Sequence, residues 1–195
     1  MRKRNITIVL IILLCLLLIS VMTHRVDKID QVAYDIISKV QLPFIDVLLI
    51  CVTTLLHPVI ICLLCAIATI LYKKRNRILI PINLISATLL AHGLKYVFKR
   101  PRPEINLIGE TGFSLPSAHA CVSLAFIGFI LYLMYQENKK MRWSIVILGT
   151  LLILLIGISR IYLGVHYFSD IIIGYLVAII YLIFYTKILE KHHLL

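Results

Sequence analysis

Long uncharged apolar runs are the feature that most restricts how this chain can fold. The first extends from Ile6 to Met22 without a charged residue. A helix of about 20 apolar residues crosses a bilayer core, because it satisfies its own backbone hydrogen bonds there. We therefore predict an all-α polytopic membrane protein with six transmembrane helices. The predicted helices lie at about residues 6–22, 47–72, 78–98, 117–135, 143–163 and 167–186.

The apolar runs take up most of the chain, which has 195 residues and is 61% hydrophobic. No stretch is left for a separate soluble domain, so residues 1–195 are predicted to form a single membrane-embedded domain. The first run could instead be a cleaved signal peptide. Its length, and the absence of a small-x-small cleavage site at residues 23–25, favour a retained helix. Pro58 is expected to kink the second helix.

The basic residues indicate how the chain is oriented. The net charge is +11, which in a soluble protein would suggest a nucleic-acid partner. Here Lys and Arg gather in short links at residues 2–4, 73–77, 139–142 and 187–191. This is the positive-inside pattern, so we expect both termini in the cytoplasm and no nucleic-acid partner. The predicted location is the cytoplasmic (inner) membrane.

Residues 26–40 differ from the other runs because apolar and charged side chains alternate at helical spacing. The apolar positions are Val26, Ile29, Ala33, Ile36, Ile37 and Val40. This pattern predicts a short amphipathic helix that lies in the outer interface and ends at Pro43. Its role could be in substrate entry, or it could be a simple spacer. The five cysteines all lie in apolar runs, and we interpret even the Cys62–Cys65 pair as apolar filler, not a redox or metal site.

Reactive side chains occur at the predicted helix ends on the side opposite the basic links. His166 and Asp170 are four residues apart where the last helix begins. A carboxylate at that spacing can accept the Nδ1 proton of the imidazole and leave Nε2 free as a nucleophile or base. A polar cap at a helix entrance is the alternative. Because Arg160 also lies just upstream, we favour a functional pair.

A second cluster begins the fourth helix, at Ser117 and His119. A helix N-terminus offers free N–H groups and the positive end of its dipole, which suit a phosphate. Ser117 can cap the helix or bind a phosphate oxygen. His119 can protonate a leaving oxygen. An ordinary serine cap beside an interfacial histidine would look the same in sequence.

Three cations complete the set: Lys95 and Arg102 around the end of the third helix, and Arg160 at the end of the fifth. Guanidinium groups bind phosphate oxygens in pairs, and Lys adds a point charge. Such residues can also be interfacial cations that snorkel to the membrane surface. That interpretation suits Lys99 and Arg100, whereas Glu104 and Glu110 are expected to shape substrate entry or to face water.

Together the three clusters resemble the type 2 phosphatidic acid phosphatase family, which shares its site with the vanadium haloperoxidases. The family pattern is K-x6-R-P, then P-S-G-H, then S-R-x5-H-x3-D. The matching strings here are Lys95-x6-Arg102-Pro103, Pro116-Ser117-Ala118-His119 and Ser159-Arg160-x5-His166-x3-Asp170. One position differs, because Ala118 stands where the family has glycine; alanine keeps the backbone N–H that the family uses on phosphate. The motif core is residues 95–170.

The resemblance implies a role for each matching residue. His166 would be the nucleophile that forms a phosphohistidine, Asp170 would orient it, and His119 would protonate the leaving group. The phosphoryl oxygens would be bound by Lys95, Arg102, Ser117, the backbone N–H of Ala118 and Arg160. No cluster of carboxylates accompanies the three strings, so we predict no metal and no other cofactor.

We therefore predict a membrane phosphatase with its site at the extracytoplasmic face. Its substrate would be a lipid phosphate or diphosphate, because the site lies at head-group depth. The resemblance implies undecaprenyl diphosphate, phosphatidylglycerol phosphate or phosphatidic acid, and the sequence does not choose among them or give an oligomeric state. The alternatives are a lipid phosphotransferase, or a non-catalytic transporter or binding protein that uses the same phosphate cradle.

Overall fold

The regular structure of the chain is entirely helical. The structure, a computed structural model, describes residues 2–40, 42–140 and 142–194, and no strand occurs in these residues. This confirms the predicted all-α membrane fold. The helices are α1 (Arg2–Met22), α2 (Asp27–Ser38), α3 (Pro43–Thr54), α4 (Pro58–Leu71), the 3₁₀ turn η1 (Arg75–Ile78), α5 (Leu79–Phe98), α6 (Ala118–Glu137), α7 (Trp143–Tyr162) and α8 (Phe168–Lys191).

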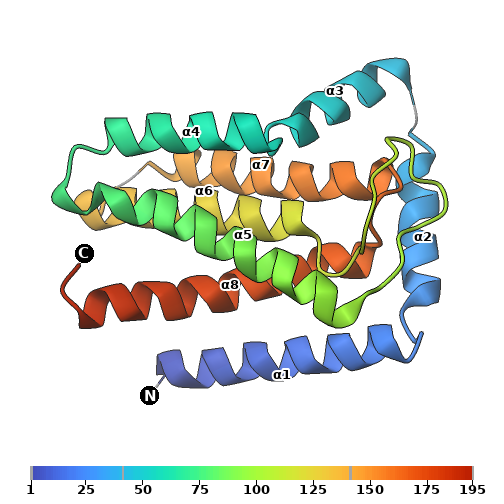
Figure 1. Cartoon of the computed structure of the whole chain (residues 1–195), viewed down its shortest axis with the longest axis horizontal. Coiled ribbons are helices and arrows are strands. Elements are labelled where there is room, and N and C mark those ends of the chain that lie inside the picture. The colour runs from blue at the N-terminus through green and yellow to red at the C-terminus, as the bar shows by residue number, and fades with distance from the viewer. Residues whose placement is uncertain (1, 41, 141, 195) are drawn as a thin grey trace.

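The long helices form a bundle around α6, which packs against α5, α7 and α8 (Figure 1). Helix α1 packs against α8, and α3 packs against α7. Both chain termini lie at one end of the bundle, and α2 crosses the other end. The end of α5, the start of α6, the end of α7 and the start of α8 are therefore all brought to the end that α2 covers.

The lengths of the helices agree with the predicted spans, with one break. Among the described residues, five helices are long and apolar enough to cross a membrane, and a bent pair makes a sixth if it is one span. That pair is α3 with α4, which meet at an angle of 57°. The break confirms the kink expected at Pro58, which is the first residue of α4. Proline is favoured there because the first helical N–H has no intrahelical acceptor.

The predicted amphipathic helix is present as α2, but its end and its buried face differ from the prediction. It ends at Ser38, and Pro43 begins α3 instead of ending α2. Val26 is buried, whereas Ile29 and Ile36 are more than half exposed. The side chain on α2 that is buried most deeply is Asp30, at 4% exposure. The face turned to the bundle is therefore centred on a carboxylate, because that carboxylate has partners on α8 and in the loop after α5.

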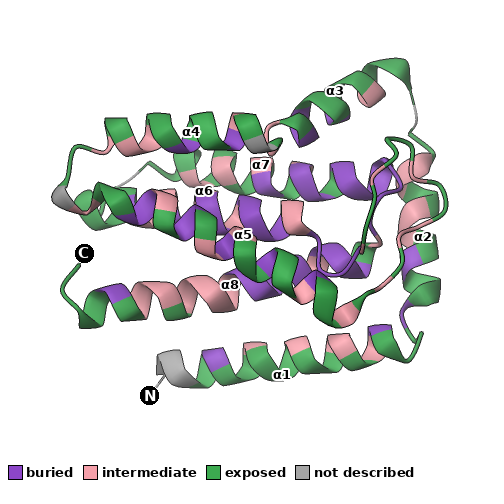
Figure 2. Ribbon diagram, in the orientation of Figure 1, coloured by how far each residue is buried: buried purple, intermediate pink, exposed green. Residues whose placement is uncertain are grey.

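Burial follows the packing order of the helices (Figure 2). Buried residues concentrate on α6, α7 and α8, where these helices face one another, and α1 and α4 are mostly exposed. Exposed Leu, Ile and Val side chains are expected on a helix surface that contacts lipid, because lipid tails are as apolar as the side chains. Most of the polar residues that are buried, among them Arg160, His166 and Asp170, lie at the end covered by α2, whereas Thr7 and Asn83 lie toward the opposite end.

Gly174 allows α8 to approach the start of α6. A Cβ atom at this position would lie 2.8 Å from the carbonyl oxygen of Ser117 and 3.1 Å from the Cβ of Ala120. The backbone N–H of Ser117 also donates to the carbonyl oxygen of Asp170, at 3.1 Å. The absence of a side chain at Gly174 therefore sets the spacing between the two helix starts that carry the reactive residues.

We expect Gly174→Ala to destabilise the protein by about 1–3 kcal/mol, the usual cost of overpacking, because the new methyl group would collide with backbone atoms of α6. The thermal unfolding temperature in detergent measures this. Gly93→Ala is the matched control, since a Cβ at Gly93 meets nothing within 4 Å. Equal unfolding temperatures for the two variants would show that the close approach is not required.

Candidate active site

Two backbone hydrogen bonds hold the segments of the site together. The long loop between α5 and α6 pairs with the turn between α7 and α8: the N–H of Asn106 donates to the carbonyl of Gly164 (3.1 Å), and that of Leu107 to Leu163 (3.0 Å). Gly164 has a φ of +64°, a left-handed conformation that favours glycine. The turn and the loop therefore form one unit, which presents His166 toward the loop residues.

His166 and Asp170 are in contact, as their spacing predicted. The Nδ1 atom of His166 lies 3.4 Å from an Asp170 carboxylate oxygen, and both side chains are buried. His166 precedes α8, so the contact forms because Asp170, in the first turn of α8, reaches back toward residues before the helix. The same carboxylate oxygen accepts the backbone N–H of Tyr167 at 3.0 Å.

Arg102 establishes which nitrogen of His166 carries the proton. Its Nη1 lies 3.3 Å from Nε2 of His166 and 2.8 Å from the carbonyl oxygen of Val165. A guanidinium group only donates hydrogen bonds, so Nε2 must be the acceptor and the proton must lie on Nδ1, which faces Asp170. The histidine is therefore held in the tautomer whose Nε2 lone pair accepts a hydrogen bond from Arg102 and can attack an electrophile once that hydrogen bond breaks.

Burial also keeps this histidine neutral. Loss of solvent lowers the pKa of His166 from its usual 6.5 to about 4, although the hydrogen bond to Asp170 acts in the opposite direction. Because an imidazole with a free lone pair is the nucleophilic form, His166 keeps this form well into the acidic range.

This shift predicts how stability depends on pH. The unfolded chain takes up a proton at His166 near pH 6.5, whereas the folded chain does so only near pH 4. Acid therefore favours unfolding across that window, and the contribution is absent above about pH 7. We expect the unfolding temperature to fall from pH 6.5 to pH 4, and to fall less in His166→Gln. Parallel curves for the two proteins would contradict the burial of a neutral imidazole.

The two other predicted cations also lie at this end of the bundle, and the structure gives each a fixed partner. Lys95 is buried and donates from Nζ to the carbonyl oxygens of Phe113 (2.6 Å) and Ser114 (3.3 Å). Arg160 is 1% exposed and donates from Nη1 to the hydroxyl of Thr53 on α3 (2.7 Å). Buried cations of this kind are costly unless paired, which is consistent with a site for an anion.

Glu110 lies between two of these cations, a position that its sequence context did not indicate. One carboxylate oxygen is 2.5 Å from Nη2 of Arg160, and the other is 3.2 Å from Nη2 of Arg102. Burial alone would raise the pKa of Glu110, but the two arginines hold the pKa below its usual value. The carboxylate therefore stands where an anion would bridge both guanidinium groups.

Ser117, Ala118 and His119 begin α6, as predicted. Ser117 is the N-cap, and its hydroxyl accepts the N–H of Ala120 at 3.4 Å. Ala118 is the first helical residue and is not among the residues with positive φ, so alanine in place of glycine causes no backbone strain here. Its N–H is one of the first amides of the helix, which have no intrahelical acceptor.

Part of the predicted site lines a cavity of about 480 Å³, whereas Ser117, Arg160 and Asp170 are not among its lining residues. His166, His119, Lys95, Arg102 and Glu110 line its polar end. Its remaining walls are mostly apolar and come from α4, α5 and the segment between α3 and α4, for example Ile61, Leu84 and Leu89. A cavity that is cationic at one end and apolar elsewhere suits an amphiphile with an anionic head.

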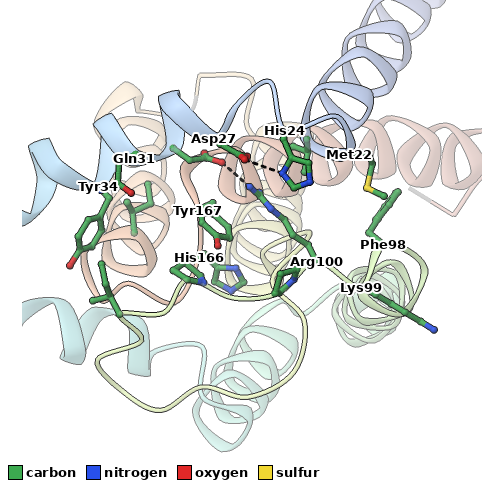
Figure 3. Close-up of a pocket in the computed structure, with 16 residues that line it drawn as sticks. Met22, His24, Asp27, Gln31, Tyr34, Phe98, Lys99, Arg100, His166 and Tyr167 are labelled. Carbon is green, nitrogen blue, oxygen red and sulfur yellow. Dashed lines mark hydrogen bonds and ion pairs between the residues drawn. The ribbon is translucent and has the colours of Figure 1, made fainter.

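A second cavity, of about 510 Å³, reaches His166 from the side of α1 and α2 (Figure 3). In this view Arg100 extends from the loop after α5 toward α2 and lies beside Tyr167. Arg100 bonds to both Asp30 and Asp170. Sequence reasoning missed this contact, since Arg100 resembled a snorkelling cation and Asp30 seemed to lie on the polar face of α2. The useful signal was that Asp30 shares a helical stripe with Val26, Tyr34 and Ile37.

Metal ligands do not gather at this site. Within the part of the chain that the structure describes, no group of three or more His, Cys, Asp or Glu side chains is placed to hold a metal ion. The five cysteines are all unpaired, and Cys65 and Cys121 are buried among helices, as expected of apolar filler. Independence from metal ions stays a prediction.

Two relatives with printed activities are similar in sequence to part of this chain. The chain is 36% identical over 92 residues to phosphatidylglycerophosphatase B of Bacillus subtilis. This alignment covers 45% of each protein. It is 32% identical over 123 residues to an undecaprenyl-diphosphatase of Sulfolobus acidocaldarius, over 57% of this chain and 55% of that protein. These alignments thus span about half the length of each relative.

Two solved structures share the fold. The crystal structure of a transmembrane PAP2-type phosphatidylglycerolphosphate phosphatase from Bacillus subtilis superposes with a TM-score of 0.79 at 24% identity, over 95% of this chain and 96% of that one. LpxE from Aquifex aeolicus superposes with a TM-score of 0.66 at 25% identity, over 79% and 92%.

The family relationship follows from the residues that the family model covers. The model of the PAP2 superfamily matches residues 76–194, which include α5 to α8 and every predicted site residue from Lys95 to Asp170. The similar proteins above with printed activities are phosphatases, among them enzymes named for lipid phosphates. With the helical membrane fold and the motif geometry in agreement, this chain belongs to the PAP2 superfamily.

Proposed function

We propose that the chain is an integral membrane phosphatase that hydrolyses lipid phosphates or diphosphates through a phosphohistidine on His166. The observation that carries this proposal is the 480 Å³ cavity, in which two histidines and two cations share one end and apolar side chains form most of the rest. A soluble phosphate ester would gain nothing from the apolar walls, whereas a lipid chain buries apolar surface there.

The first step transfers the phosphoryl group to His166. Its Nε2 lone pair attacks phosphorus, and the bond from phosphorus to the leaving oxygen breaks. In the complex with the anionic substrate, His119 is protonated and gives its proton to that oxygen. Asp170 accepts the Nδ1–H bond and stabilises the positive charge that develops on the imidazole ring. Lys95, Arg102 and Arg160 stabilise the charge on the phosphoryl oxygens, with the Ser117 hydroxyl and the Ala118 N–H at the start of α6.

The second step restores the enzyme. His119, now neutral, takes a proton from water, and the hydroxide attacks phosphorus as the P–N bond breaks. Inorganic phosphate leaves, and His166 returns to its starting state. Neither step uses a metal ion or another cofactor.

The substrate is proposed to be one of three lipids: undecaprenyl diphosphate, phosphatidylglycerol phosphate or phosphatidic acid. Support comes from the relatives named for the first two. We place the site at the extracytoplasmic face of the cytoplasmic membrane, because the end of α4 and the end of α6, which the basic links follow in sequence, lie at the opposite end of the bundle from α2. The orientation can be tested by fusing the C-terminus to a reporter that is active only in the periplasm. Reporter activity in that fusion would contradict the proposed orientation.

The test is phosphate release by the detergent-purified protein in excess EDTA, with each of the three lipids. We expect the native protein to release phosphate from at least one lipid. The His166→Ala variant should release none that can be detected. Activity that EDTA removes and one added metal restores would contradict the metal-independent mechanism. Transfer of the phosphate to a second lipid would identify a phosphotransferase. Lipid binding without release or transfer would identify the binding protein or transporter.

A further inference from the structure

The carboxylate of Asp170 needs more hydrogen-bond donors than His166 supplies. The side chain is fully buried, and a buried charge is costly unless its lone pairs are satisfied. The oxygen that faces His166 has a long contact, 3.4 Å, and also accepts the N–H of Tyr167. The other oxygen accepts Nη1 of Arg100 at 2.7 Å, a short charge-assisted hydrogen bond. Arg100 is thus the strongest partner of the carboxylate that faces the nucleophile.

Arg100 is itself held in one orientation. Its Nη1 also donates to the hydroxyl of Ser169 (2.8 Å), and its Nη2 donates to Asp30 (2.9 Å). The guanidinium plane lies over the ring of Tyr167, with its central carbon 3.9 Å from the ring centre. The planar fork therefore spans two carboxylates from different helices, which a lysine cannot do.

Asp30 joins the same group from α2, far away in the sequence. One of its oxygens accepts the backbone N–H of Ser169 at 2.8 Å, and the other accepts the Ser169 hydroxyl at 2.7 Å. Ser169 lies in the first turn of α8, where N–H groups lack intrahelical acceptors, so Asp30 caps α8 from another helix. It thus fixes both Arg100 and the turn that carries Asp170.

We propose that Arg100 and Asp30 are positioning residues that hold Asp170 against His166 and tie this pair to α2. The inference rests on the proposed phosphohistidine chemistry, which gives the orientation of His166 its importance. Arg100 lines the cavity beside α2, whereas Lys95 and Arg102 line the one that holds His119. Arg100 therefore acts on the nucleophile through Asp170 and does not bind the phosphoryl group.

The test separates positioning from binding by steady-state kinetics on whichever lipid the native protein hydrolyses. We expect Arg100→Gln to lower kcat by ~10–100-fold, the range known for outer partners of metal-binding histidines, and to leave KM within about twofold. Inhibition by inorganic phosphate should be unchanged, since the phosphate cradle is intact. Asp30→Asn should lower kcat by a smaller factor, because Arg100 keeps its bond to Asp170.

A double variant tests whether the two residues act as a unit. Because Asp30 contacts both Arg100 and Ser169, the double variant Asp30→Asn with Arg100→Gln should lower kcat below that of Arg100→Gln alone. The loss should be smaller than the product of the two single effects, since both substitutions remove the same ion pair. Arg100→Lys keeps the charge but cannot bridge both carboxylates, so its kcat should fall between native and Arg100→Gln. Asp27→Asn is the matched control on the same helix, because exposed Asp27 bonds to His24 and should leave kcat unchanged.

Variants are compared only as monodisperse protein with a measured unfolding temperature. If Arg100→Gln is not recovered folded, Arg100→Lys and Asp30→Asn decide the question. Native kcat in both, or a rise in KM with unchanged kcat, would overturn the positioning role while the native activity and the inactivity of His166→Ala still stand. Absence of activity in the native protein would instead overturn the proposed function.

Discussion

Replacement of His166 by alanine is expected to reduce phosphate release by at least ~10³-fold, because the variant has no atom that can accept the phosphoryl group. The surrounding cations and the start of α6 would still bind substrate, so KM should change much less than kcat. The measurement is release of inorganic phosphate from the preferred lipid, in EDTA and at saturating substrate.

The covalent intermediate gives this prediction a second readout. Native protein stopped in alkali during turnover of a ³²P-labelled lipid should retain label that acid removes, because a phosphohistidine is stable to base and labile in acid. His166→Gln should retain none. Label retained in that variant would place the nucleophile elsewhere, even if the rate had fallen.

Replacement of His119 by alanine is expected to slow the reaction most for substrates whose leaving group must be protonated. Lipid alkoxides are poor leaving groups, so loss of a general acid should cost ~10²–10⁴-fold with a lipid monophosphate. With p-nitrophenyl phosphate, whose phenolate leaves without protonation, formation of the intermediate should slow much less. The measurement is the rate constant of the initial burst of p-nitrophenol, compared with the rate on the lipid.

Arg160→Gln is the control variant for this comparison of two substrates. Arg160→Gln weakens stabilisation of the phosphoryl oxygens, which both substrates share, so both rates should fall by similar factors. If His119→Ala also slowed both substrates equally, His119 would be acting on the phosphoryl group and not on the leaving oxygen.

The sequence predicted the helices and the reactive residues because both leave local signals. A membrane helix shows as an apolar run, and Lys95, His119 and His166 fall at the ends of such runs in a recognisable spacing. The sequence signal for the bend between α3 and α4 was equally local, because it is the single residue Pro58 at the start of α4. In the structure Lys95, His119 and His166 line one cavity, and their chemical roles stay predictions.

The contacts that support the site were not predicted, because they join residues far apart in the chain. Asp30 bonds to Ser169, and Glu110 to Arg160. No spacing rule links such pairs, and a carboxylate on an amphipathic helix normally faces water. The orientation of α2 depends on the partners that α8 offers, which is tertiary information. The prediction that Pro43 ends the amphipathic helix was wrong for a related reason. Proline is compatible both with the end of one helix and with the start of the next.

The position of Glu110 makes binding at this site an exchange of anions. A phosphate that contacts both Arg102 and Arg160 has to displace the carboxylate that already bridges them. The arginines therefore keep a counter-ion in the absence of substrate, and the affinity for phosphate reflects only its advantage over a carboxylate. In the proposed reaction, the return of Glu110 to the arginines after hydrolysis would favour the departure of inorganic phosphate, because the carboxylate competes with the product for the same two guanidinium groups.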